Sequence, residues 1–168
     1  SPLQDDTIDF ITIASAGNSV DYGDLSQARS ANASSSNQSR IVVAGGTNPG
    51  VVNTIDFFSP VSMGTATDFG DLTQARGSLN ATSQSHGGIA AESQRAPELY
   101  SPTGKVLPQG RGRGDIGLFA GGDPGNDDTI QHVTISTTGN AIDFGNLTQG
   151  RFETDAVSNG TRAIWGGG

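Results

Sequence analysis

The residues best suited to chemistry are the aspartates of an acidic, glycine-rich stretch. Asp123, Asp127 and Asp128 lie in the sequence Gly-Asp-Pro-Gly-Asn-Asp-Asp. Calcium is bound by several oxygen ligands on a flexible loop, and this stretch supplies both the oxygens and the flexibility. Its spacing does not match an EF-hand loop, and turns use Asp and Asn for backbone reasons alone. The sequence favours a solvated turn, with a calcium site at these aspartates as the alternative and no other cofactor indicated.

Three aromatic residues are candidates for a different chemistry, the stacking of sugar rings. They are Trp165, Tyr22 and Tyr100, in a chain that has one Trp and two Tyr. Aromatic side chains with a polar atom are common at binding surfaces. A carbohydrate-binding role therefore depends on these three positions.

Residues for catalysis are scarce. The chain has no cysteine, and its two histidines, His86 and His132, are 46 residues apart with no nucleophile signature near them. The sequence also lacks the Gly-x-Ser-x-Gly pattern that presents a reactive serine. We therefore expect a protein that is not an enzyme.

Composition bounds the fold and the partners. The 168 residues include 25 glycines, and no window has apolar residues at helical spacing, which predicts an all-β chain of short strands and many turns. The net charge of −8 and only nine dispersed basic residues argue against nucleic acid as a partner. No apolar run approaches the length of a membrane-spanning helix, so we expect no membrane partner.

One sequence block recurs along the chain. Residues 21–29 read Asp-Tyr-Gly-Asp-Leu-Ser-Gln-Ala-Arg, residues 68–76 read Asp-Phe-Gly-Asp-Leu-Thr-Gln-Ala-Arg, and residues 143–151 read Asp-Phe-Gly-Asn-Leu-Thr-Gln-Gly-Arg. Ile8 and Ile55, which precede the first two blocks, are 47 residues apart. This periodicity predicts one domain, 1–168, of about four units, at about 2–48, 49–95, 96–123 (shortened) and 124–168.

Each full unit is expected to form a four-stranded antiparallel sheet that packs against its neighbours. Polar residues that recur in step with the units are predicted to do repeated structural work. Asp24, Asp71 and Asn146 are expected to cap turns through their side-chain oxygens. The arginines are expected to hold neighbouring strands by bonding carbonyl groups or those carboxylates, and they are Arg29, Arg76, Arg111 and Arg151.

The units resemble kelch repeats. The resemblance is carried by a glycine pair after an apolar strand, by the strand that follows it, and by a Ser-Pro-x-x-Gly turn, most clearly in residues 96–104 (Ala-Pro-Glu-Leu-Tyr-Ser-Pro-Thr-Gly). The long units are similar to the kelch-like tandem repeats of structural proteins from marine bacteriophages, above all cyanophages. The resemblance covers essentially the whole chain. It implies a kelch-type β-propeller or a partial propeller.

The same resemblance implies a function. We expect a non-enzymatic structural or appendage protein of a virion, such as a capsid decoration, a knob or a tail-associated propeller. Its expected partners are other virion proteins, further propeller repeats or host-surface glycans. Two alternatives are an extracellular or cell-surface adhesin or carbohydrate-binding propeller, and a blade fragment of a kelch-associated oxidase. The copper site of galactose oxidase requires a cysteine, which this chain lacks.

The number of units raises a question of closure. Kelch propellers usually close with six or seven blades, whereas four units are counted here. The chain is therefore expected to belong to a larger assembly, and a fragment of a longer array is favoured because the sequence begins in phase with the units and ends where a unit finishes. A longer polypeptide, several chains in one ring, and a small four-bladed ring are the three ways to close it.

Overall fold

The computed structural model describes residues 4–84, 114–159 and 162–168. These residues contain strands and no helix, which confirms the all-β prediction. None of the described segments is a helix long and apolar enough to cross a membrane. The strands are β1 (Thr7–Phe10), β2 (Val20–Asp24), β3 (Ala33–Ser36), β4 (Ile41–Ala44), β5 (Thr47–Asn48), β6 (Gly50–Val51), β7 (Thr54–Phe58), β8 (Thr67–Asp71), β9 (Asn80–Ser83), β10 (Ile116–Ala120), β11 (Thr129–Thr134), β12 (Ile142–Asn146), β13 (Asp155–Ser158) and β14 (Ala163–Gly166).

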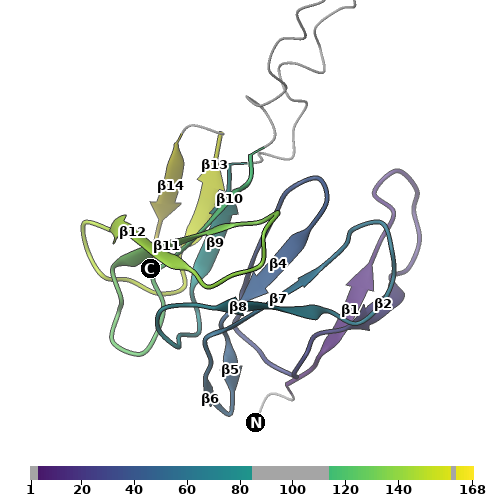
Figure 1. Cartoon of the computed structure of the whole chain (residues 1–168), viewed down its shortest axis with the longest axis horizontal. Coiled ribbons are helices and arrows are strands. Elements are labelled where there is room, and N and C mark those ends of the chain that lie inside the picture. The colour runs from purple at the N-terminus through teal and green to yellow at the C-terminus, as the bar shows by residue number, and fades with distance from the viewer. Residues whose placement is uncertain (1–3, 85–113, 160–161) are drawn as a thin grey trace, which may run out of the picture.

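The strands form antiparallel sheets that follow one another across the molecule (Figure 1). The first complete sheet has the order β3-β4-β7-β8, and the second complete sheet has the order β9-β10-β11-β12. The N-terminal hairpin (β1-β2) and the C-terminal hairpin (β13-β14) are two-stranded, as is the small β5-β6 ribbon. The described residues therefore form an open array, and no closed ring is present among them.

The sheets do not coincide with the units expected from the sequence. The first complete sheet takes β3 and β4 from unit 2–48 and takes β7 and β8 from unit 49–95. The reason is that the glycine pair links two paired strands of one sheet. Gly45 and Gly46 have φ values of +65° and +111°, and such angles suit residues without a Cβ. The described residues hold two four-stranded sheets, two terminal hairpins and the β5-β6 ribbon, where a four-stranded sheet was expected from each full unit.

The shortened unit 96–123 has no sheet of its own in the described part of the chain. Its apolar run forms β10, which pairs with β9 on one side and with β11 on the other. Residues 85–113 fall between β9 and β10 and lie outside the described residues, together with His86, Tyr100 and Arg111.

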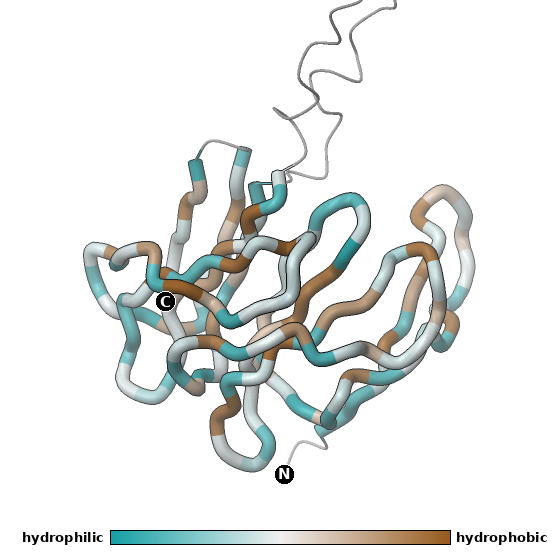
Figure 2. Tube along the Cα trace, in the orientation of Figure 1, coloured by the Kyte–Doolittle hydropathy of each residue, from teal (hydrophilic) through white to brown (hydrophobic). Residues whose placement is uncertain are grey.

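Two hydrophobic clusters fill the spaces between successive sheets. The larger lies between the two complete sheets and includes Val42, Phe69, Phe119, Val133 and Ile135. The smaller lies between the N-terminal hairpin and the first complete sheet, and is formed by Leu25, Val43 and Ala66 with partly buried neighbours. Figure 2 shows the hydrophobic strands of the complete sheets in the interior. Because Val42 and Val43 belong to different clusters, both faces of β4 are buried, which explains its continuous apolar sequence.

Candidate functional site

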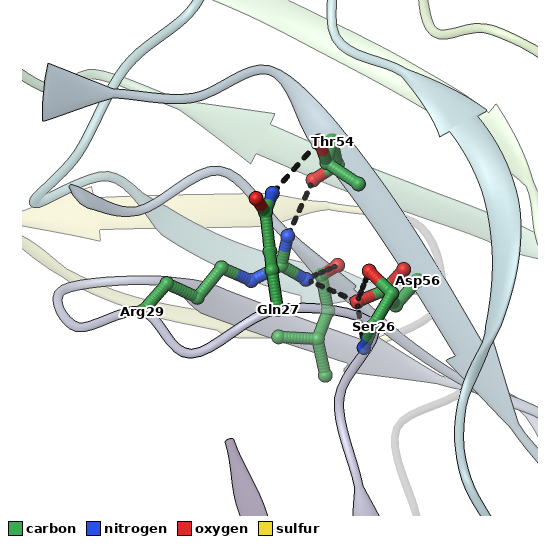
Figure 3. A network of polar contacts seen from close by, with 6 residues as sticks. Ser26, Gln27, Arg29, Thr54 and Asp56 are labelled. Carbon is green, nitrogen blue, oxygen red and sulfur yellow. Dashed lines mark hydrogen bonds and ion pairs between the residues drawn. The ribbon is translucent and has the colours of Figure 1, made fainter. Parts of the chain in front are cut away.

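The most elaborate polar site in the described structure is a junction between the N-terminal hairpin and the first complete sheet (Figure 3). Arg29 is buried there, and its Nη2 lies 3.0 Å from Oδ2 of Asp56. The same guanidinium donates to the carbonyl oxygens of Val43 (3.0 Å) and Thr54 (3.2 Å). Ser26 donates its N–H and its hydroxyl to Asp56. One arginine thus ties a loop of the hairpin to two strands of the next sheet.

A second junction of the same design joins the two complete sheets. Arg76 is buried and donates through Nη1 to the carbonyl oxygens of Gly121 (2.9 Å) and Thr129 (3.1 Å). Its Nη2 lies 3.5 Å from Oδ2 of Asp127. The N–H of Thr73 donates to Oε1 of Gln131, which occupies the place that Asp56 has in the first junction. The repeated Gln-Ala-Arg sequence therefore builds a repeated contact between sheets.

The third member of this arginine series is only half engaged. Arg151 donates through Nη1 to the carbonyl oxygen of Gly167 (3.1 Å) and through Nε to that of Gln149 (3.4 Å). Within the described residues it has no carboxylate partner. The prediction that these arginines hold neighbouring strands is confirmed for Arg29 and Arg76. Arg151 makes only the hydrogen bonds to backbone carbonyl oxygens.

The electrostatics of the junctions follow from burial. Burial lowers the pKa of Arg29, and the carboxylate of Asp56 opposes this shift. Burial likewise lowers the pKa of Arg76, against the influence of Asp127. Burial raises the pKa of Asp127, but hydrogen bonds from Thr129 and the charge of Arg76 outweigh it, so the net pKa is below the ordinary 3.8. The ionised carboxylate is therefore favoured at the second junction.

Acid should weaken this second junction. Because the pKa of Asp127 is lower in the folded than in the unfolded chain, its stabilisation is complete above the ordinary 3.8 and is lost as the pH falls through the folded value. We expect Asp127→Asn to lower the free energy of unfolding by about 1 kcal/mol at about pH 6, and by less at about pH 3. Urea unfolding at both pH values measures this, and Asp128→Asn is the matched control. Equal losses for Asp127→Asn at the two pH values would contradict it.

The three aspartates of the predicted calcium loop do not come together as ligands. In the described residues no group of three or more acidic or histidine side chains is placed to hold a metal ion. Asp127 accepts from the N–H of Thr129 and faces Arg76, and Asp123 accepts from the N–H of Gly125. The favoured expectation of a solvated turn fits Asp123 and Asp128, which are exposed. Asp127 differs because it belongs to the junction between sheets.

The aromatic candidates are also placed differently from the expectation of an exposed stacking surface. Tyr22 is buried, packs against Phe10 and Phe58, and directs its hydroxyl to the carbonyl oxygens of Ser59 and Ser62. Trp165 is half-buried on β14, and Tyr100 lies outside the described residues. The structure does not bring Tyr22 and Trp165 to one surface, because they belong to hairpins at opposite ends of the array (Figure 1).

The side-chain acceptors seen near Asp24 and Asn146 are other residues, and they act inside strands β2 and β12, not in turns. Asp21 and Asp143 accept from the N–H groups of Gly23 and Gly145, and they lie three residues before Asp24 and Asn146. The carboxylate that sequence reasoning missed is Asp56. A charged residue inside the apolar strand Thr-Ile-Asp-Phe was the available signal, because a buried charge needs a partner.

Comparisons with known proteins add no relative. No protein-family model matches the chain, and a search of curated protein sequences gives no match either. The kelch-like resemblance therefore stays a prediction from the residues.

Proposed function

We propose that this chain is a non-enzymatic structural module of a larger assembly, and that its sheets are blades of a kelch-type β-propeller. The observation that carries the proposal is the use of the recurring polar residues. Arg29, Arg76, Asp56 and Asp127 are all engaged in contacts between sheets. Side chains that a reaction would need to expose are instead employed to hold the array together.

For the setting of this module we propose a virus particle, as a capsid decoration, a knob or a tail-associated protein. The support is the similarity of the long units to tandem repeats in phage structural proteins, together with the acidic, glycine-rich composition. The partners we propose are other virion proteins or further propeller repeats. The buried position of Tyr22 removes one of the three aromatics on which a carbohydrate-binding role depends.

Purified particles test this setting. We expect peptides of this chain in mass spectra of density-gradient-purified virions from its source, and antibodies against the chain should label those particles in electron micrographs. A protein found only in the particle-free cell fraction would refute the virion setting. Unrelated proteins of the same lysate, followed through the gradient, control for carry-over.

A further inference from the structure

We propose that two copies of this chain join head to tail into a closed ring of six sheets, with β14 of each copy pairing with β1 of the other. The inference rests on the proposed structural role and names the partner, a second copy of the chain. It concerns how chains associate, whereas the particle experiment concerns location, so that either can fail alone.

The two terminal hairpins are complementary halves of one sheet. β1-β2 matches the outer strand pairs of the complete sheets, β7-β8 and β11-β12. Its pairing register shifts between Ile8 and Asp9, and the registers of the outer pairs shift at the equivalent places, between Ile55 and Asp56 and between Ile130 and Gln131. β13-β14 matches the inner strand pairs, β3-β4 and β9-β10, since Asp155 lies opposite Gly166 as Ala33 lies opposite Ala44. Gly167 and Gly168 repeat the positive φ angles of Gly45 and Gly46. Together the hairpins have the strands of a complete sheet.

The free edges of these hairpins fit each other. In the described residues β14 pairs only with β13, and β1 pairs only with β2. Equivalent strands are joined inside the chain, where β4 pairs with β7 and β10 pairs with β11. The same register places Ala163 of one copy opposite Ile11 of the other, as Ile41 lies opposite Phe58. Exposed strand edges readily pair with another chain, and here the matching strand is in the same sequence.

The apolar surfaces at the two ends are also complementary. Between the complete sheets, Val42 and Phe69 pack in one cluster with Val133 and Ile135. Leu118 and Phe144 are equivalent to Val42 and Phe69, and they line an open hollow of about 200 Å³. Ile11 and Ile13 are equivalent to Val133 and Ile135, and both are exposed.

The exposed fractions show how much each end differs from the internal contact. Phe69 is 3% exposed and its equivalent Phe144 is 61% exposed, while Ile135 is 0% exposed and its equivalent Ile13 is 98% exposed. Figure 2 shows this hydrophobic stretch at the tip of the loop between β1 and β2, at the outer end of the molecule. Ile11 and Ile13 of a second copy would fill the hollow beside Leu118 and Phe144, and remove both apolar surfaces from water.

Backbone contacts repeat in the same way. Gly139 donates its N–H to the carbonyl of Phe69 (2.8 Å), and Gly64 donates to that of Tyr22 (3.0 Å). The next carbonyl in this series belongs to Phe144, and the next donor is Gly17 at the tip of the N-terminal hairpin. Gly145 has nothing within 4 Å of its Cβ position, whereas the equivalent Gly23 and Gly70 lie against Gly64 and Gly139. Gly17 of a second copy would supply Gly145 with the neighbour found at the internal junctions.

Charge favours the same pairing. Among the described residues Arg151 has no carboxylate partner, whereas Arg29 has Asp56 and Arg76 has Asp127. The residue equivalent to Asp56 is Asp9, and the one equivalent to Asp127 is Asp5, and both are exposed on or beside β1. The strand pairing presents both carboxylates of the second copy to Arg151.

A buried group on β14 lacks a partner that Asp9 would provide. The indole Nε1 of Trp165 is buried and has no hydrogen-bond acceptor in the part of the chain that the structure describes. Buried polar groups of native proteins are usually paired. The register puts Asp9 of the second copy opposite Trp165, as Asp56 lies opposite Val43, so a carboxylate oxygen comes to the face that holds the indole N–H.

The ring size follows from the number of sheets. The described residues of each copy supply two complete sheets and two half sheets, so these residues add three sheets per copy to a closed ring. Propellers typically have about four to eight blades, and two copies are the number that falls in this range. A head-to-tail contact closes into a ring when its rotation allows.

A disulfide between two engineered cysteines tests the strand pairing, since the chain has no cysteine of its own. Chains with Ile11→Cys are mixed with chains with Ala163→Cys under mild oxidation. Residues directly opposite in adjacent strands are within disulfide reach, so we expect a covalent dimer of the two variants. Val61→Cys, at a more exposed site on an internal loop, replaces Ile11→Cys in the control and should give no such product with Ala163→Cys.

Exchange of the charges tests the partner residues. Light scattering of the wild-type chain should give twice its 17.1 kDa, and Arg151→Asp or Asp9→Arg alone should reduce this to the single mass. The double variant Arg151→Asp with Asp9→Arg restores opposite charges at both junctions and should restore the dimer. Circular dichroism confirms that each variant is folded.

A wild-type chain that stays monomeric at high micromolar concentration would overturn the proposal. The proposal would also be overturned if the chain is dimeric but the Ile11→Cys and Ala163→Cys variants form no disulfide with each other. A dimer that persists in both Arg151→Asp and Asp9→Arg would overturn it as well. A larger assembly that gives the cross-link would retain the strand pairing and overturn the ring of two copies.

Discussion

Arg29→Ala is expected to cost about 3–5 kcal/mol of unfolding free energy, the usual loss when one partner of a buried ion pair is removed. Asp56 is fully buried, and its Oδ2 receives Ser26 and Arg29. Without the guanidinium, the carboxylate keeps its burial and loses its counter-charge. Small domains are stable by only about 5–15 kcal/mol, so the loss is a large fraction of the total.

Urea unfolding followed by circular dichroism measures this loss. Arg162→Ala, at an exposed arginine, is the control and should change the free energy of unfolding by less than about 0.5 kcal/mol. The double variant Arg29→Met with Asp56→Leu should lose less than Arg29→Ala, because no charge is left unpaired. A loss below about 1 kcal/mol for Arg29→Ala would show that the ion pair is not a major junction contact.

Gly70→Ala is the second change with a large expected effect. A Cβ at Gly70 would lie 2.5 Å from the carbonyl oxygen of Gly139 on the next sheet, so the two complete sheets would have to separate. Gly145 has nearly the same φ, +146° against +147°, but nothing within 4 Å of its Cβ position. Gly145→Ala therefore carries the same backbone strain without the clash.

The comparison isolates the contact between sheets. We expect Gly70→Ala to cost about 1–3 kcal/mol more than Gly145→Ala, as overpacking of a tight contact does. Both variants are made with Arg151→Asp, so that only contacts within one chain are measured by thermal and urea unfolding. Equal losses would mean that backbone strain, and not the approach of the sheets, decides the stability at these glycines.

The all-β class and the role of the arginines could be predicted because both depend on short, local sequence patterns. Short apolar runs between turn residues predict strands, and an arginine recurring at one place in each unit indicates a repeated contact. The division into sheets could not be predicted in the same way. Whether the glycine pair ends a sheet or links two of its strands depends on pairing between β4 and β7, which no local pattern specifies.

In the candidate site, too, local sequence predicts some features, while others depend on partners that are distant in the sequence. The acidic neighbours of Asp127 mark it as a candidate in the sequence, yet its main partner, Arg76, lies 51 residues earlier. Asp56 went unnoticed because one aspartate in an apolar strand resembles ordinary alternation of inward and outward residues. Only the neighbouring sheet on its far side makes that position interior. Sequence patterns describe one sheet at a time, whereas these residues act between two.

The arginine junctions also determine how stability is distributed along the chain. Each internal junction consists of one arginine and one apolar cluster shared by two adjacent sheets, and no described contact links sheets that are not neighbours in the array. Free energy in such an array grows with the number of neighbouring pairs, as in a one-dimensional chain of coupled units. The array could therefore be lengthened or shortened by whole units without redesign of any interior, and its least stable members would always be those at an open end.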